Sequence, residues 1–274
     1  MGRGLRYGGA MAEELRAITA ADGARISYTV FFGAGPAIIV LHGLAGSGRE
    51  FIPTAEALAP RRVILVDQRG HGASTRMPAD VSRLAFVDDV VRVIEAEEHE
   101  PVDLVGQSMG AHTAMLVAAH RPDLVRRLVM LEGDAGGGSA DDRAAIGSFF
   151  RSWPVPFADR ADAREFLGDG ALARAWIADL EQRSDGLYPR FDADVMVRTL
   201  EGMSAPNRSE WESVSAPSLV VYADGGMFTE EQKADFVAGG RRVARMDLVG
   251  ASHDAHLDAF DEWIAVLGSF LTAE

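Results

Sequence analysis

The pentapeptide Gly106-Gln107-Ser108-Met109-Gly110 constrains this chain more than any other sequence feature. It follows the apolar run Val102–Val105 and precedes an apolar, alanine-rich stretch, Ala111–Ala119. This order predicts a strand, a sharp turn and a helix, with the Ser108 hydroxyl held clear of the sheet. Glycines on both sides allow the strand to fold back closely against the helix, where side chains would collide. The pattern therefore indicates a serine nucleophile.

Short apolar runs of the kind found in buried strands alternate with segments of helical periodicity along much of the chain. This alternation predicts the α/β class, with a mostly parallel central sheet and helices on both of its faces. An antiparallel hairpin, Arg16–Thr19 with Ile26–Phe32, is predicted to precede it. The predicted strands are Ala37–Leu41, Val63–Val66, Val102–Val105, Leu128–Leu131, Leu219–Tyr222 and Val243–Val249, and the predicted helices are Glu50–Ala59, Phe86–Glu98, Met109–His120 and Asp258–Leu271.

The alternation stops between about Asp134 and Ser215, where helix-like segments and aromatic residues collect. We interpret residues 135–214 as a helical cap over a core domain that comprises residues 12–134 and 215–274. Residues 1–11 are interpreted as a disordered leader. A cap of this kind excludes water and shapes a mostly apolar pocket. The predicted cap helices are Ala144–Phe150, Ala161–Phe166, Leu172–Arg183 and Asp194–Gly202.

The charge balance and the lack of cysteine exclude several functions. The 274 residues include 41 acidic and 27 basic side chains, so the net charge is −14. Such a surface repels nucleic acid and anionic membranes, and we expect a small-molecule substrate and neither of those partners. The absence of cysteine excludes disulfides and thiol catalysis. With no signal-peptide pattern, it also favours a cytoplasmic protein. The sequence carries no signal for an oligomeric state.

A serine nucleophile needs a base to remove its proton, and histidine is the usual base. In hydrolases built on an open α/β sheet, the catalytic residues follow the chain order serine, acid, histidine. Of the seven histidines, His253 and His256 lie after the last predicted strand. A loop in that position can bring an imidazole over the nucleophile. His99, His112 and His120 are interpreted as helix-surface or packing residues.

Four motifs follow one another along the chain: Leu41-His42-Gly43-Leu44, Asp67–Ser74, Gly106–Gly110 and Gly250–His253. In this order they resemble the oxyanion loop, the D-x-R-G-x-G-x-S turn, the nucleophile elbow and the segment that carries the catalytic histidine in the α/β-hydrolase superfamily. The chain resembles that superfamily from about residue 15 onward, and the resemblance implies the α/β-hydrolase fold of its serine hydrolase branch.

The resemblance also implies roles for single residues. It places the general base on His253 and gives His256 a packing role near the last helix. It assigns the oxyanion hole to the backbone N–H groups of Leu44 and Met109, which would stabilise the developing negative charge. His42 and His71 are expected to hold loop conformations through hydrogen bonds.

The acid of the triad departs from the commonest pattern. In most of the superfamily an aspartate follows the penultimate strand, and that position here falls on Gly226. Branches resembling haloalkane dehalogenases and certain lactone hydrolases take the acid from the end of the strand after the elbow helix. Glu132 stands there, 24 residues after Ser108. We therefore predict Glu132 as the acid, with Asp224 and Asp134 as alternatives.

These residues favour acyl transfer to water. We predict a serine hydrolase that cleaves a carboxylic ester or lactone of a small, moderately apolar molecule through an acyl-enzyme, with no cofactor and no metal. A nucleophilic serine argues against dehalogenase and epoxide-hydrolase chemistry, because both use a carboxylate. The alternatives are a carbon–carbon bond hydrolase of a diketone-type substrate and a small-molecule binding protein, which the glycine at position 226 favours.

Overall fold

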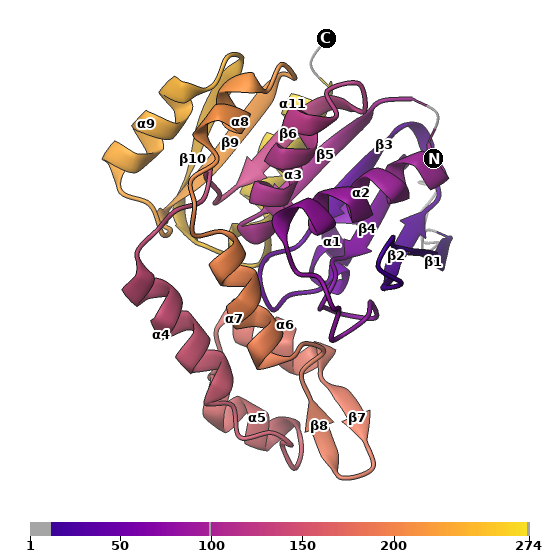
Figure 1. The fold of residues 1–274 in the computed structure, drawn as a ribbon, viewed down its shortest axis with the longest axis vertical. Coiled ribbons are helices and arrows are strands. Elements are labelled where there is room, and N and C mark those ends of the chain that lie inside the picture. Colours follow the sequence, from indigo (N-terminus) through magenta and orange to yellow (C-terminus); the bar gives the residue numbers. More distant parts are fainter. Residues whose placement is uncertain (1–11, 99, 273–274) are drawn as a thin grey trace, which may run out of the picture.

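A computed structural model describes residues 12–98 and 100–272, so the predicted leader and His99 lie outside the described residues. Eight strands form one sheet in the order β1-β2-β4-β3-β5-β6-β9-β10 (Figure 1). The pairs β1–β2 and β2–β4 are antiparallel, and all pairs from β4 to β10 are parallel. The predicted α/β class with a mostly parallel sheet is confirmed. The strands are β1 (Glu13–Thr19), β2 (Arg25–Phe31), β3 (Ala34–Leu41), β4 (Arg61–Asp67), β5 (Val102–Gln107), β6 (Val125–Leu131), β9 (Ser218–Gly225) and β10 (Val243–Ser252).

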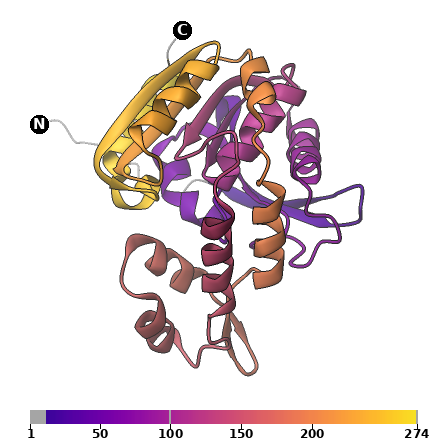
Figure 2. The same cartoon turned by 60° about the vertical axis from the view of Figure 1, so that its left-hand side comes forward.

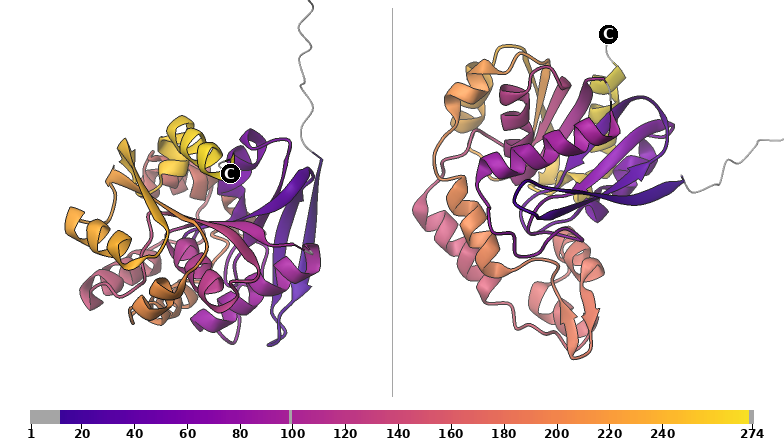
Figure 3. Two further views of the ribbon diagram at one scale, coloured as in Figure 1. Left: turned by 90° about the horizontal axis from the view of Figure 1, so that it is seen from above. Right: turned by 45° about the vertical axis from the view of Figure 1, so that its right-hand side comes forward.

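Helices cover both faces of the sheet, as the view from above shows (Figure 3). One face is covered by α2 (Arg83–Glu97), α3 (Met109–His120), α8 (Arg208–Ser213) and α9 (Glu230–Gly239). The other is covered by η1 (Gly48–Phe51), α1 (Ile52–Ala57), α10 (Ala255–Asp258) and α11 (Phe260–Thr272). The sequence interpretation missed α8 and α9, although Thr229 and Gln232 form a capping box at the start of α9.

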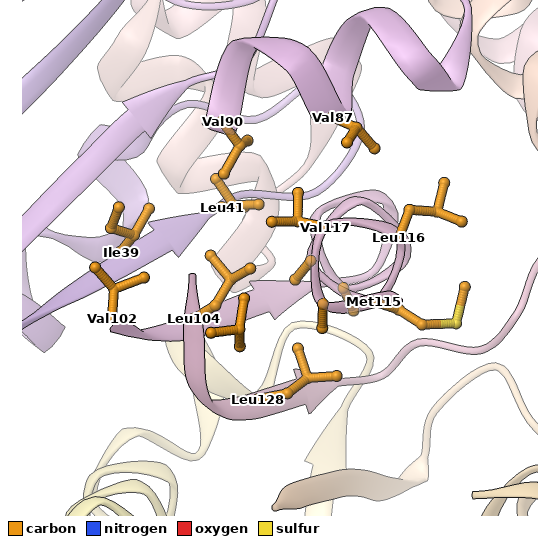
Figure 4. Close-up of a cluster of buried hydrophobic side chains, with 14 of the residues drawn as sticks. Ile39, Leu41, Val87, Val90, Val102, Leu104, Met115, Leu116, Val117 and Leu128 are labelled. Atoms are coloured by element: carbon orange, nitrogen blue, oxygen red, sulfur yellow. The ribbon is translucent and has the colours of Figure 1, made fainter. Parts of the chain in front are cut away.

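The core on the α2–α3 face anchors the strand that carries the nucleophile. Val90 of α2 and Val117 of α3 are buried against Leu41 at the end of β3 and Leu104 in β5 (Figure 4). Full burial of each such side chain stabilises the fold by about 1.5–3 kcal/mol. Packing against α2 and α3 therefore fixes the position of the turn after β5.

Four helices and a small hairpin lie beyond the carboxyl-terminal ends of the parallel strands (Figures 1 and 2). They are α4 (Ala140–Arg151), α5 (Arg160–Leu167), α6 (Ala171–Asp179), β7 (Glu181–Arg183), β8 (Gly186–Tyr188) and α7 (Ala193–Gly202), and we call them the cap. A buried cluster of aromatic and aliphatic side chains, including Phe150, Trp153 and Phe157, holds these elements together. The cluster also includes Met109, which joins the cap to the first turn of α3.

The predicted helix Leu172–Arg183 is wrong in its last four residues. Helix α6 ends at Asp179, and Glu181–Arg183 instead pairs as an antiparallel strand with Gly186–Tyr188. Gly186 has a φ of +146°, a backbone conformation that residues with side chains rarely adopt. The chain therefore reverses direction just before Gly186. Two short strands form there in place of the last turn of the predicted helix.

Candidate active site

Ser108 occupies the sharp turn between β5 and α3. Its φ is +51° and its ψ is −117°, a strained backbone conformation for a residue with a side chain. Its hydroxyl makes no capping bond to the helix Met109–His120. The Ser108 backbone N–H donates to the Leu131 carbonyl at 2.9 Å, which ties the turn to the neighbouring strand β6. The hydroxyl is thus presented by a turn that packing and backbone bonds hold in place.

The two glycines of the pentapeptide are required by close backbone contacts. A Cβ atom at Gly106 would lie 2.3 Å from the Gly110 carbonyl oxygen, and one at Gly110 would lie 2.2 Å from that of Leu41. Both contacts involve backbone, which cannot move away without shifting β3 or α3. Any side chain at either position would therefore push the serine out of its place.

Met109 and Leu44, the predicted oxyanion donors, both line the cavity that Ser108 lines. Met109 is the first residue of α3, and the N–H groups of a first helical turn have no partner inside their helix. The helix dipole adds partial positive charge at this end. Leu44 follows β3 in a loop where Ala45 has a φ of +61°, so the chain turns sharply beside the nucleophile. Both residues therefore remain the predicted oxyanion donors, and both line the cavity in which the oxyanion would form.

His42 holds the base of this loop. Its Nδ1 lies 2.7 Å from the Gly43 carbonyl oxygen, so Nδ1 donates, and its Nε2 accepts from the Gln68 backbone N–H at 3.0 Å. Complete burial lowers its pKa to about 4, so the ring is uncharged at neutral pH. His71 is equally buried, and its Nδ1 lies 2.9 Å from the Arg69 carbonyl oxygen.

The carboxylate of Glu132 contacts His253. Glu132 follows β6 with a φ of +49°, and its Oε2 lies 3.0 Å from the His253 Nδ1. Because an ionised carboxylate can only accept, Nδ1 carries the proton, and Nε2 is the ring nitrogen that can accept one. His253 follows β10, and the Gln107 side chain donates to its carbonyl oxygen at 3.2 Å. Strands β5, β6 and β10 therefore bring the three predicted residues to one edge of the sheet.

Glu132 is fully buried, yet its hydrogen bonds favour the ionised form. Burial raises the pKa of the carboxyl group. The bonds from the His253 ring and from the backbone N–H groups of Ala223 and Met227, at 2.8 and 3.0 Å for the two amides, outweigh burial and leave the pKa below its ordinary value. Glu132 thus stays negatively charged and can stabilise an imidazolium.

Gly226 stands where most of the superfamily carries its aspartate, and it lies against the same carboxylate. A Cβ atom at Gly226 would be 2.3 Å from both Oε1 and Oε2 of Glu132. Asp224 is exposed and accepts from the Gly250 backbone N–H at 2.9 Å, while Asp134 accepts from that of Gly136 at 2.8 Å. Within the described residues, Glu132 is the carboxylate at hydrogen-bonding distance from the His253 ring.

Two other histidines lie near the site. His256 is buried on α10 and stacks on Phe51 with a ring separation of 4.3 Å, which is a packing role. His112 is buried on α3, lines the cavity and contacts the Asn207 side chain at 3.1 Å through Nε2. Burial, together with the nearby Arg83, lowers the pKa of His112 to about 3. The sequence interpretation of His112 as a surface or packing residue missed its place in the cavity wall.

A cavity of about 600 Å³ lies between the cap and the carboxyl ends of the strands. Its floor includes Ser108, Met109 and His253, and its opposite wall is largely apolar. That wall is formed by cap side chains, among them Ala145, Ile146, Phe149, Phe150, Leu172, Trp176, Leu200 and Met203. A volume of this size accommodates a small organic molecule.

The model of a known protein family, described as the alpha/beta hydrolase fold, matches residues 36–260. The chain belongs to this family. As a member of the alpha/beta hydrolase family, it is similar over 112 residues, at 43% identity, to the sn-1-specific diacylglycerol lipase ABHD11 of Mus musculus. It is also similar over 102 residues, at 35% identity, to the (E)-2-((N-methylformamido)methylene)succinate hydrolase of Acinetobacter baylyi. Hydrolysis is therefore the activity class that family membership supports.

These sequence matches are partial. They cover 39% and 37% of this alpha/beta hydrolase and 36% and 39% of the two relatives. A crystal structure of E-2-(acetamidomethylene)succinate hydrolase superimposes with a TM-score of 0.85, over 95% of this chain and 100% of that one, at 21% identity. That likeness shows the same fold over nearly the whole chain, the cap included.

No group of three or more histidine, aspartate or glutamate side chains in residues 12–98 and 100–272 is arranged to hold a metal ion. In the same residues, no helix has both the length and the apolar character that crossing a membrane requires.

Proposed function

We propose that this alpha/beta hydrolase cleaves a carboxylic ester or lactone of a small, moderately apolar molecule, with Ser108 as nucleophile, His253 as general base and Glu132 as the acid that orients it. One observation carries the proposal. The Glu132 carboxylate bonds to His253 Nδ1 at 3.0 Å, at a cavity that both His253 and the strained Ser108 line. An imidazole held in this tautomer, at the same cavity as a serine on a sharp turn, is suited to removing the serine proton.

The proposed reaction has two halves. As Ser108 Oγ attacks the substrate carbonyl carbon, its proton passes to His253 Nε2, and the N–H groups of Leu44 and Met109 bind the oxyanion. The tetrahedral intermediate then collapses and breaks the bond between the carbonyl carbon and the leaving oxygen. The leaving oxygen takes the proton from His253. Water then attacks the acyl-Ser108 ester and gives a proton to His253. The carboxylic acid leaves as this proton returns to Ser108 Oγ, and no cofactor is consumed.

The cavity and one relative support an ester substrate with an apolar part. Aromatic and aliphatic side chains such as Phe149, Phe150 and Trp176 line the wall above the serine, and apolar walls with few polar groups bind small apolar molecules. The similar mouse protein is named a diacylglycerol lipase. The Glu132 carboxylate favours an enzyme over a small-molecule binding protein. It supplies the negative charge next to His253 that Gly226 cannot supply.

Hydrolysis of p-nitrophenyl butyrate by the wild type, Ser108→Ala and Ser209→Ala tests the proposal. Ser209 is exposed on α8 and serves as a matched serine control. We expect turnover in the wild type and in Ser209→Ala, and a loss of at least about 1,000-fold in kcat for Ser108→Ala. Equal turnover in Ser108→Ala and wild type would reject Ser108 as the nucleophile.

A further inference from the structure

Glu50 lies in the cavity wall and has no part in the mechanism above. It belongs to the short helix η1, and its side chain is 6% exposed. It lines the cavity together with Leu44, Ser108 and Asp254, so it faces the space between the oxyanion loop and the His253 loop. A carboxyl group in the wall of this cavity can either repel or bind a substrate, depending on its charge.

The local backbone fixes the position of this carboxyl group. Ser47 precedes η1 and Glu50 follows three residues later, the spacing at which a glutamate reaches back to the N-cap backbone N–H. The Ser47 N–H makes this bond. A Cβ atom at Gly46 would lie 2.8 Å from Glu50 Oε2, so the carboxyl group is packed against the oxyanion loop. It cannot swing away into solvent without breaking these contacts.

The charged groups around Glu50 are mainly acidic. Asp67 at the end of β4 and Asp254 before α10 both interact electrostatically with it. Of the described residues, His256 has the one basic side chain within 4 Å, with its Nε2 3.6 Å from Glu50 Oε2. Burial lowers the pKa of His256 to about 4, so at neutral pH this ring carries no positive charge to balance a carboxylate.

Arg49 is a nearby cation whose partner is another carboxylate. Arg49, the neighbour of Glu50 on η1, is exposed and pairs with Asp179 of α6 at 3.5 Å. Burial raises the pKa of Glu50. The hydrogen bond from the Ser47 N–H lowers this pKa, the negative charge of Asp67 raises it further, and the resulting pKa is about 8. At neutral pH Glu50 is therefore mostly an uncharged carboxylic acid, which has a proton to donate.

We infer that the Glu50 carboxyl group donates a hydrogen bond to an uncharged oxygen of the substrate, in addition to the scissile ester, and so acts as a specificity-determining residue. This inference rests on the proposed function and names a substrate class within it, esters or lactones that carry a second, uncharged oxygen acceptor. A site that offers a buried donor disfavours analogues that lack the acceptor, because the donor then loses its partner.

The first test is the pH dependence of kcat/KM between pH 6 and 9.5 for p-nitrophenyl esters. At each pH the rate of Ser108→Ala is subtracted, so that Ser108-dependent turnover is measured. For an oxygen-bearing ester we expect the wild type to lose about 3- to 10-fold as the pH rises through 8, because an ionised Glu50 cannot donate. Glu50→Gln keeps an uncharged donor at every pH and should lack this decline.

The second test uses acyl chains of equal length that carry an ether oxygen or a methylene group at successive positions. We expect one ether position to raise kcat/KM over its methylene counterpart by about 3- to 10-fold in the wild type and in Glu50→Gln at pH 7. Glu50→Leu should lose that advantage, so that its ratio of kcat/KM for the ether ester to kcat/KM for the methylene ester falls to about 1, whatever its turnover of the plain alkyl esters. Glu56→Gln, the same change at an exposed site on α1, should behave like the wild type in both tests.

The outcomes separate the two proposals. An absence of Ser108-dependent turnover with all esters would reject the proposed function and this inference with it. A second outcome is turnover that depends on Ser108 but declines equally at high pH in wild type and Glu50→Gln. It would reject the role of Glu50 and leave the proposed function standing. An ether advantage that survives in Glu50→Leu would also reject the role of Glu50.

Discussion

The carboxylate of Glu132 occupies the space that a side chain at Gly226 would need. A Cβ atom at Gly226 would lie 2.3 Å from both carboxylate oxygens, and the next residue, Met227, donates its backbone N–H to Oε2 at 3.0 Å. The end of β6 and the loop after β9 are thus coupled. An acid at position 132 requires a residue without a side chain at position 226, and the loop then binds that acid.

This coupling predicts the effect of returning an aspartate to position 226. Gly226→Asp places a second carboxylate against Glu132 in a buried site, where like charges repel and atoms overlap. We expect a drop in Tm of several degrees and at least about a 100-fold loss in kcat. Circular dichroism melting and ester hydrolysis would measure both effects.

Adding Glu132→Ala to Gly226→Asp should restore part of the kcat that Gly226→Asp removes. In Glu132→Ala with Gly226→Asp, the clash is gone, and the new aspartate can approach His253 from the usual position. We expect the double variant to exceed both single variants in kcat. Gly170→Asp provides a control, because a Cβ atom there meets nothing within 4 Å. A double variant no better than Glu132→Ala would contradict the coupling.

The choice between Glu132 and Asp224 as the acid gives a sharper prediction. Glu132→Gln keeps the shape of the side chain but removes the charge that stabilises the imidazolium, so we expect kcat to fall by about 100- to 10,000-fold. Asp224→Asn changes an exposed side chain whose bond goes to the Gly250 N–H, and we expect kcat within about 3-fold of wild type. If Asp224→Asn were the variant that abolished turnover, the assignment of Glu132 would be wrong.

The tight contact at Gly110 predicts a loss of stability from a single methyl group. Gly110→Ala would place its Cβ 2.2 Å from the Leu41 carbonyl oxygen, and we expect the free energy of unfolding to fall by about 1–3 kcal/mol. Gly268→Ala, in α11 and without an atom within 4 Å of the added Cβ, should raise it by about 0.5–1 kcal/mol. Urea unfolding of both variants provides the comparison, and equal effects would contradict the close contact.

The raised pKa of Glu50 predicts a pH-dependent stability that does not require any substrate. The folded state keeps this proton up to about pH 8, whereas the unfolded chain loses it near the ordinary value of 4.5. Stability from this group is therefore complete below about pH 4.5 and is lost as the pH rises toward 8. Relative to wild type, Glu50→Gln should gain Tm between pH 5 and pH 9. A Tm difference independent of pH would show that Glu50 is ionised throughout.

The main residues of the candidate site could be predicted because chain order and strand ends are visible in the sequence. Parallel strands end at one edge of a sheet, so Ser108 after β5, Glu132 after β6 and His253 after β10 converge there. The structure places their side chains around one cavity, with Glu132 on His253. Their catalytic roles remain predictions that the variants above test.

Other features depend on contacts between segments distant in sequence. From the sequence alone, Gly226 indicates that the acid of the triad is absent. The structure shows that the Glu132 carboxylate fills the space beside Gly226. His112 and Glu50 resemble ordinary helix residues, and their place in the cavity wall follows from how the cap closes over the sheet. The β7–β8 hairpin was missed because Glu181–Arg183 continues the polarity pattern of α6.

The central claim is that Ser108 is the nucleophile and that His253 and Glu132 activate it. Labelling with a fluorophosphonate ester, followed by peptide mass mapping, tests this most directly, because the reagent forms a stable bond to an activated serine oxygen. We predict one adduct per chain, on the peptide that contains Ser108, with labelling slowed at least about 100-fold in Glu132→Gln and in His253→Ala. Labelling at another serine would contradict the account, and so would labelling of these two variants at the wild-type rate.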